Sequence, residues 1–283
     1  LASTSSMSAD KRYSLAFIKE TVVPNSWLEV VQEGLKIPGL LVQIYGDLAK
    51  PGVQQVGKAL GTVLGLGNTV LWPIHWANER SRIYLEKNLE DYRAGMEEVP
   101  LEKVVPVAPE IGIPIAEKLT YVRDPKLSDM YITLLAKASN ADFVAEAHPS
   151  FVNVINNLSP DDAQLLETFV SGSDLEFVTA KWSGQGKYSF AGDLLIAPER
   201  TESLMYPQNV PAYLSNLAGL GLVSIHHDRA IHGSTAYQAL ETHWATIFPP
   251  TKAPEPDREL KFEHGVVCVT KFGSQFISAC HSA

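Results

Sequence analysis

Two glycines and a lysine near residue 55 have the spacing of a phosphate-binding loop. Gly52 and Gly57 are separated by four residues and Lys58 follows, which matches the pattern Gly-x4-Gly-Lys. In such a loop the next residue is Ser or Thr, which binds magnesium, whereas this chain has Ala59. The segment also lacks a preceding hydrophobic strand. We therefore expect the start of a helix with a single lysine there, and no nucleotide cofactor.

Three histidines close together suggest a metal site. His226, His227 and His232 lie near Asp228, but a zinc site needs three or four converging ligands. No second group of ligands follows at metal-ligand spacing. We expect these histidines to lie in a solvent-exposed loop, and we expect no metal.

No arrangement for covalent catalysis is present in the sequence. There is no Gly-x-Ser-x-Gly motif, and the adjacent acids Asp161 and Asp162 suit the start of a helix rather than two sides of a cleft. Cys268 lies in an alternating strand pattern and is expected to be a small buried hydrophobic residue. The two cysteines, Cys268 and Cys280, do not make a disulfide framework and suggest a reducing, cytoplasmic compartment. We expect a protein that is not an enzyme.

A regular glycine repeat is the most informative feature of the chain. Gly57, Gly61 and Gly65 recur at every fourth residue, so a helix would place them on one face, where another backbone can approach closely. From residue 59 to residue 78 there is no Asp, Glu, Lys or Arg, and this length approaches that of a membrane span. Trp72 and Trp76 would suit a bilayer interface. These five residues are our candidate site for oligomerisation or membrane contact.

The same glycines have a plainer interpretation, in which they allow two helices to cross tightly inside a folded protein. Thr62, Asn68 and Pro73 interrupt the apolar stretch, and a glycine inside a helix costs about 0.5 to 1 kcal/mol relative to alanine. Permanent insertion into a membrane is therefore not expected. Conditional membrane association, on activation, and permanent packing in the protein both remain open.

The composition indicates a folded protein with a sizeable core. The chain has 283 residues, of which 45% are hydrophobic and 19% are charged, enough for one large domain or two ordinary ones. Its net charge is −9, from 23 basic and 32 acidic residues. This charge argues against general affinity for nucleic acids.

The elements expected up to residue 170 are helices. Residues 77–97 carry an apolar stripe at helical spacing, and Asp124-Pro125 and Ser159-Pro160 are typical helix starts. Between these helices, prolines at positions 100, 106, 109 and 114 predict an extended linker or broken turns up to about residue 114. We divide this part into an N-terminal segment, partly disordered, over 1–24 and a helical domain with the glycine helix over 25–157.

The pattern changes after residue 170 to short helices and strands. A helix is expected to end at Gly219 or Gly221, followed by a strand, an irregular loop insertion over 227–258, a hairpin with its turn at His264-Gly265, and a final helix capped by Thr270. This order is typical of a winged-helix unit, which we assign to 158–283. The fold class is therefore mainly α, an N-terminal helical bundle followed by a winged-helix-like α+β part.

Several runs of the sequence resemble the Abi-alpha (abortive infection alpha) family. The runs that carry the resemblance are KPGVQQVGKALGTVLGLGN, HPSFVNVINNLSPDDA, LSNLAGLGLVSI and VTKFGSQFISAC, and the similarity covers most of residues 48–280. The resemblance implies a role in bacterial abortive infection against phage. It supplies no catalytic residues. The insertion at 226–258 is longer than expected for the family.

Three functional hypotheses follow. The first is a non-enzymatic effector or regulator of phage defence, which acts when its glycine helix is released for oligomerisation or membrane damage. The second is a soluble protein-binding scaffold or inhibitor that uses the winged-helix-like part and keeps the glycine helix packed. The third, a DNA-binding regulator, is disfavoured because residues 208–219, the helix that would enter the groove, contain no Lys or Arg. The expected partner is another protein or a second copy of the chain.

Overall fold

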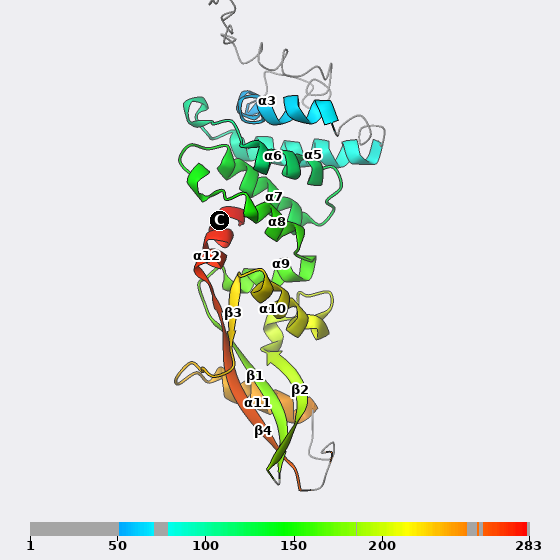
Figure 1. Cartoon of the computed structure of the whole chain (residues 1–283), viewed down its shortest axis with the longest axis vertical. Coiled ribbons are helices and arrows are strands. Elements are labelled where there is room, and N and C mark those ends of the chain that lie inside the picture. The colour runs from blue at the N-terminus through cyan, green and yellow to red at the C-terminus, as the bar shows by residue number, and fades with distance from the viewer. Residues whose placement is uncertain (1–50, 71–78, 185, 248–253, 255–256, 282–283) are drawn as a thin grey trace, which may run out of the picture.

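The molecule is elongated, with stacked helices at one end and an arm built on a twisted sheet at the other (Figure 1). The structure is a computed structural model that describes residues 51–70, 79–184, 186–247, 254 and 257–281. Within these ranges the N-terminal part is helical and the C-terminal part combines helices with four antiparallel strands. The mainly helical fold class is thereby confirmed at this level.

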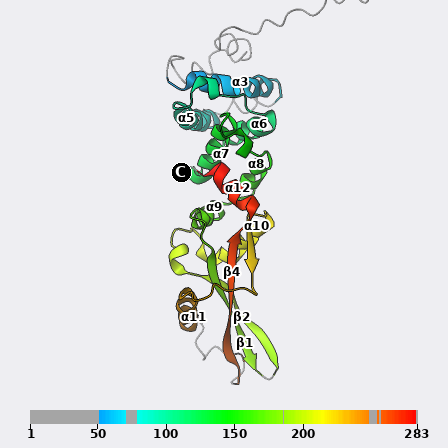
Figure 2. The same cartoon turned by 90° about the vertical axis from the view of Figure 1, so that its left-hand side faces the viewer.

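Over the described residues, the helical end contains six α-helices and three short 3-10 turns. Helix α3 lies at the tip and packs on α5 and α6, and α7 connects this layer to α8 and α9 (Figures 1 and 2). The helices are α3 (Val53–Val70), α5 (Glu79–Met96), α6 (Pro109–Lys118), α7 (Pro125–Ala138), α8 (Ser150–Asn156) and α9 (Pro160–Leu166), and the turns are η1 (Leu101–Lys103), η2 (Val144–Glu146) and η3 (Glu167–Phe169).

The predicted helix starts are confirmed by their capping bonds. The Asp124 carboxylate accepts from Leu127 N at 3.0 Å, and Ser159 and Asp162 form a reciprocal capping box at the start of α9. The apolar stripe of α5 is also confirmed, because Leu85, Leu89, Tyr92 and Met96 are all buried.

The arm is a four-stranded antiparallel sheet in the order β2-β1-β4-β3, with helices at the end next to the helical part and on one face. Helix α10 lies near the helical end, α11 lies against the far half of the sheet, and α12 returns to the helical end (Figures 1 and 2). The elements are β1 (Leu175–Gly184), β2 (Lys187–Ile196), η4 (Pro198–Arg200), η5 (Pro207–Asn209), α10 (Val210–Gly219), β3 (Val223–His226), α11 (Ala236–Ile247), β4 (Glu259–Val269) and α12 (Lys271–Cys280).

One large hydrophobic core runs from α3 to the near half of the sheet, and a smaller one lies under α11. Helix α12 joins the two ends, because the rings of Phe272 and Phe276 both lie 5.4 Å from that of Phe151 in α8. Phe276 is fully buried. The core therefore crosses residue 157, where we predicted a domain boundary, and the boundary itself stays a prediction.

The predicted irregular loop insertion at 227–258 is wrong in its central part. Helix α11 occupies Ala236–Ile247 and places Tyr237, Leu240 and Trp244 against the sheet, where all three are buried. Their spacing of three and four residues is that of a helix, but the irregular, proline-containing stretch after it obscured the pattern.

Two other predicted breaks are also absent. The proline-rich segment holds α6, which begins at Pro109 and contains Pro114 in its interior, so the extended linker ends earlier than expected. The expected turn at His264-Gly265 lies instead inside β4, which pairs with β1 without interruption from Leu175↔Val267 to Ser183↔Glu259. A winged-helix hairpin at that position is therefore wrong.

Among the helices that the structure describes, none combines the length and the apolar character needed to cross a membrane.

Candidate functional site

Helix α3 carries the glycine repeat. Gly57 and Gly61 are both buried, and Gly65 belongs to the same helix. Helix α3 packs closely on α6 through a different face, because a Cβ added to Gly112 of α6 would lie 2.3 Å from Val63 Cγ2. Trp72 and Trp76, the other two predicted site residues, lie outside the described residues.

Two polar side chains of α3 donate hydrogen bonds to the backbone of residues 99–101. Lys58 Nζ donates to Leu101 O at 2.8 Å, and Gln55 Nε2 donates to Val99 O at 3.3 Å. A backbone bond of 2.9 Å from Val107 N to Ala59 O adds a third link. Since Lys58 is used in this way and the helix begins at Val53, the interpretation of the Gly-x4-Gly-Lys pattern as a helix start is confirmed.

The cysteines and histidines do not form a reactive centre in the part of the chain that the structure describes. Burial raises the thiol pKa of Cys280, and burial together with Asp174 raises that of Cys268, so neither is an activated nucleophile. Cys280 is buried, whereas Cys268, which we predicted to be buried, is only half-buried. No three His, Cys, Asp or Glu side chains of this part converge as metal ligands.

The far half of the sheet has two contrasting faces. In antiparallel pairs, residues directly opposite one another point to the same face. Val178 and Ala180 in β1 face α11, together with Phe262 opposite Ala180, and this face is covered. The residues that alternate with these along each strand point away from α11, and we call the surface that they form the open face. It comprises Thr179, Lys181, Ser183, Tyr188, Phe190, Glu259, Lys261 and Glu263.

The open face carries an exposed aromatic pair. Tyr188 is 66% exposed and Phe190 is 70% exposed, and their rings meet edge to face with centroids 6.1 Å apart. Lys181 Nζ lies 5.1 Å from the Tyr188 ring centroid and 5.3 Å from that of Phe190. Its other neighbour is Glu263 Oε2, at 2.5 Å. The lysine is therefore held in place by a carboxylate on one side and two rings on the other.

A hollow of about 690 Å³ lies on the same surface. Its lining comes from strands β2, β1 and β4 and from the segment that follows β3. The residues that line it are Thr179, Lys181, Phe190, Ala191, Gly192, Asp193, His227 and Glu263. Among the described residues of this lining, no hydrogen bond joins a nucleophile to a base.

Strand β2 is irregular where it borders the hollow. The pairs Val178↔Leu195, Ala180↔Gly192 and Lys181↔Phe190 show a register shift on each side of Ala180. Such bulges bend a strand and redirect its side chains, and they are frequent beside functional sites. Here they separate the exposed first half of β2, which carries the aromatic pair, from the second half, which packs near α10.

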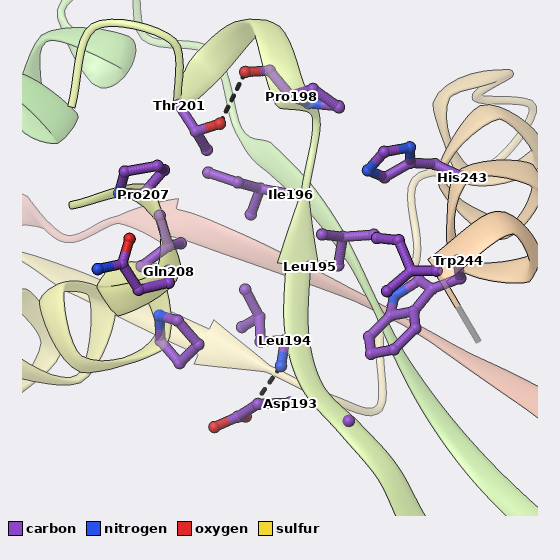
Figure 3. Close-up of a pocket in the computed structure, with 14 residues that line it drawn as sticks. Asp193, Leu194, Leu195, Ile196, Pro198, Thr201, Pro207, Gln208, His243 and Trp244 are labelled. Carbon is purple, nitrogen blue, oxygen red and sulfur yellow. Dashed lines mark hydrogen bonds between the residues drawn. The ribbon is translucent and has the colours of Figure 1, made fainter. Parts of the chain in front are cut away.

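On the other side of β2 lies a second hollow, of about 440 Å³, between β2, the 198–211 loop and α11. Figure 3 shows Trp244 and His243 of α11 on one side of the strand and Pro207 and Gln208 on the other. Two of its polar groups are bonded locally, because Thr201 Oγ1 donates to Pro198 O at 2.8 Å and Asp193 Oδ1 accepts from Leu194 N at 2.8 Å. This hollow is a mostly apolar gap between elements and shows no reactive arrangement.

The open face was not predicted from the sequence. Residues 187–190 read Lys-Tyr-Ser-Phe, an alternation of polar and aromatic side chains that is typical of a strand with one exposed face. The surrounding Gly- and Ser-rich composition concealed this signal. The charged residues opposite, on β1 and β4, become neighbours only when the sheet forms.

Comparisons with known proteins give one family. The family model described as abortive infection alpha matches residues 84–280, a range that contains the whole sheet and begins after α3. None of the curated proteins matches the chain. A solved structure of an uncharacterized protein from the marine bacterium Alcanivorax borkumensis SK2 is similar at 17% identity over 47% of this chain and 92% of that one, but its TM-score of 0.27 is too low to support an argument.

Proposed function

Because the chain belongs to the abortive infection alpha family, we propose that it takes part in phage defence as a non-enzymatic protein that binds another protein. The observation that carries this proposal is the aromatic pair Tyr188 and Phe190, which stands exposed on the open face. Exposed aromatic residues that are held rigidly are the usual anchors of protein interfaces. The raised thiol pKa values and the separated histidines support a role without catalysis.

The partner of the open face is a protein surface with both apolar and charged groups. Tyr188 and Phe190 offer apolar area, while Lys181, Lys261 and Glu263 surround them with both signs of charge. This pattern, an apolar centre within a polar rim, matches protein interfaces rather than the uniformly basic surface that binds nucleic acids.

The proposal is tested by phage challenge of cells that carry the gene, an empty vector or a variant. We expect Tyr188→Ser combined with Phe190→Ser to lose protection while the purified protein keeps its melting temperature. The matched control is Tyr121→Ser, which removes a 45% exposed tyrosine from the helical end and should keep protection. Full protection by the double variant would contradict the proposal.

Release of α3 for oligomerisation or membrane perturbation is a second candidate mechanism, favoured by the buried glycines Gly57 and Gly61. Under this mechanism, α3 leaves α5 and α6 and presents its glycine face to another copy or to a bilayer. The bonds from Lys58 and Gln55 to the 99–101 segment resist such release. The test measures leakage of liposomes caused by wild type and by Gly61→Leu, with and without phage extract. If neither protein causes leakage under any condition, this mechanism is ruled out.

We infer that the region from α9 to α12 makes contacts with protein rather than with DNA. Helix α10 contains no Lys or Arg, and two of its polar side chains are bonded within the protein. Tyr213 Oη donates to Asp161 at 2.7 Å, and Asn216 Nδ2 donates to Asn157 O at 3.0 Å. Retardation of duplex DNA with a steep salt dependence would contradict this inference.

A further inference from the structure

The hollow on the open face contains a buried hydroxyl group that is available to a ligand. Thr179 is only 7% exposed, and it lines the hollow. Within the described residues its hydroxyl forms no hydrogen bond, although a hydroxyl can donate one and accept two. Buried polar groups are normally satisfied by protein, water or a bound molecule. The floor of the hollow therefore offers a hydrogen-bonding group to whatever enters it.

The bulge in β2 brings an aromatic ring and a carboxylate to the same hollow. In a regular strand, residues three apart point to opposite faces of the sheet. The register against β1 skips Ala191, and this extra residue changes the alternation. As a result, both Phe190 and Asp193 line the hollow. Figure 3 shows Asp193 on the opposite side of β2 from Trp244, which packs on the covered face.

The charge that remains unpaired in the hollow is negative. The Glu263 carboxylate is paired with Lys181 Nζ at 2.5 Å, so these two charges offset one another. Asp193 forms no ion pair with any other described residue, and its Oδ1 accepts from Leu194 N at 2.8 Å. The lining has one further titratable group, His227, whose ring packs edge to face against an aromatic ring of β1. A hollow with this balance of charges favours a cationic group.

We propose that the hollow binds an arginine side chain of the partner protein, an inference that rests on the proposed function. A guanidinium group is planar and can stack on the Phe190 ring, its paired N–H groups suit the Asp193 carboxylate, and a further N–H can reach the Thr179 hydroxyl. A lysine ammonium has no flat face for the ring. The net charge of −9 on the whole chain also favours the approach of a basic partner.

The test is the binding of a single arginine residue to the full chain, measured by NMR. N-acetyl-arginine methylamide should shift the signals of the Thr179 methyl group and of the 191–193 amides, and the shifts should saturate with a Kd of about 1 mM, as expected for so small a ligand. The citrulline analogue has the same shape without the charge, and it should bind about tenfold more weakly. The lysine analogue should also bind more weakly than the arginine compound.

Single substitutions test each contact, with the 191–193 amides as the reporter. Asp193→Asn removes the charge and should weaken binding about tenfold. Thr179→Val keeps the shape without the hydroxyl, and Phe190→Leu keeps an apolar group without the flat ring, so each should weaken binding about three- to tenfold. The matched control is Glu199→Gln, an exposed acid of η4 outside the lining, which should bind like wild type. Melting temperatures show that each variant is folded.

Three results would overturn the inference. They are no saturable shift at about 20 mM arginine compound, roughly twentyfold above the expected Kd, equal binding of the citrulline or N-acetyl-glutamate analogue, and equal affinity of Asp193→Asn and Glu199→Gln. The proposed function fails separately. If arginine binds but the Tyr188 and Phe190 double variant keeps full phage protection, only the proposed function is contradicted. If that variant loses protection but arginine does not bind, only the present inference is contradicted.

Discussion

The helical end and the sheet arm differ in what their polar and aromatic side chains contact. In the helical end, buried polar groups form hydrogen bonds with one another. Tyr92 Oη and Ser139 Oγ lie 2.5 Å apart, and Asn88 Nδ2 donates to Leu119 O at 2.8 Å. In the arm, α11 covers one face of the far half of the sheet, and the opposite face keeps two aromatic rings in solvent.

This difference separates a region built for stability from a region with surface available for binding. A buried polar pair rigidifies a core, because leaving either group without a partner costs about 1 to 3 kcal/mol. An exposed aromatic ring contributes little to the stability of the isolated chain, and its apolar area becomes useful only when another surface covers it. We therefore expect that truncation of an aromatic ring lowers the stability of the protein at a buried position and weakens binding at an exposed position.

The largest effect should come from truncating a buried ring in the arm. Phe177→Ala removes a fully buried side chain that contacts His227 and lies under Gly265, so we expect a loss of about 3 to 5 kcal/mol. Urea unfolding followed by circular dichroism measures this loss. A change below about 1 kcal/mol would show that the arm does not share the core of the molecule.

The next effect concerns the junction between the two regions, where Asp161 holds the loop before α10. Its carboxylate accepts from Met205 N at 2.8 Å, Tyr206 N at 2.9 Å and the Tyr213 hydroxyl at 2.7 Å. Asp161→Asn replaces a charged acceptor with an amide and should cost about 1.5 to 3 kcal/mol at pH 7. The matched control is Asp193→Asn, which lies on the arm and should change the melting temperature little.

The same carboxylate should make stability depend on pH. Burial acts to raise the pKa of Asp161, but the three hydrogen bonds outweigh it and lower the pKa below the ordinary value. Because the pKa is lower in the folded protein, the stabilisation is present above the unfolded value of about 3.9 and is lost as the pH falls through the folded value. Wild type should therefore lose more stability than Asp161→Asn on acidification from pH 5. Parallel pH profiles for the two proteins would contradict this.

A smaller effect is expected where α3 meets α6. Gly112→Ala inserts a methyl group 2.3 Å from Val63 Cγ2, which the helices relieve only by moving apart. The overpacking costs about 1 to 3 kcal/mol, and the better helix propensity of alanine returns up to about 1 kcal/mol of this. Gly95→Ala is the control, because nothing lies within 4 Å of its added Cβ. Thermal melting of the two variants should differ in sign.

The smallest effect on stability should come from Phe190→Ala, the open counterpart of Phe177→Ala. Phe190 is 70% exposed, so its removal should change the free energy of unfolding by less than about 0.5 kcal/mol. Its effect should appear instead in binding and in phage protection. A large loss of stability would show that the ring packs against the protein and is not free for a partner.

Local chemistry made part of this structure predictable. The starts of α7, α9 and α12 follow from Asp124, Ser159 and Thr270, whose side chains accept hydrogen bonds from backbone groups three residues later. The amphipathic stripe of α5 and the strand at Val223–His226 follow from periodicity within one segment. In each case, the residues that specify the helix or strand lie within it or next to it in the sequence.

The open face and the course of β4 were decided by contacts between distant residues. Gly265 resembles a turn residue in the sequence, but it continues β4 because Phe177 of β1 occupies the space of its missing side chain, 2.1 Å from an added Cβ. Likewise, nothing in Lys-Tyr-Ser-Phe specifies which face α11 covers. The sequence by itself determined the helix starts, the apolar stripes and the absence of a catalytic motif. Only the tertiary structure decided which strands pair and which aromatic rings stay exposed, because register and burial depend on partners far away in the chain.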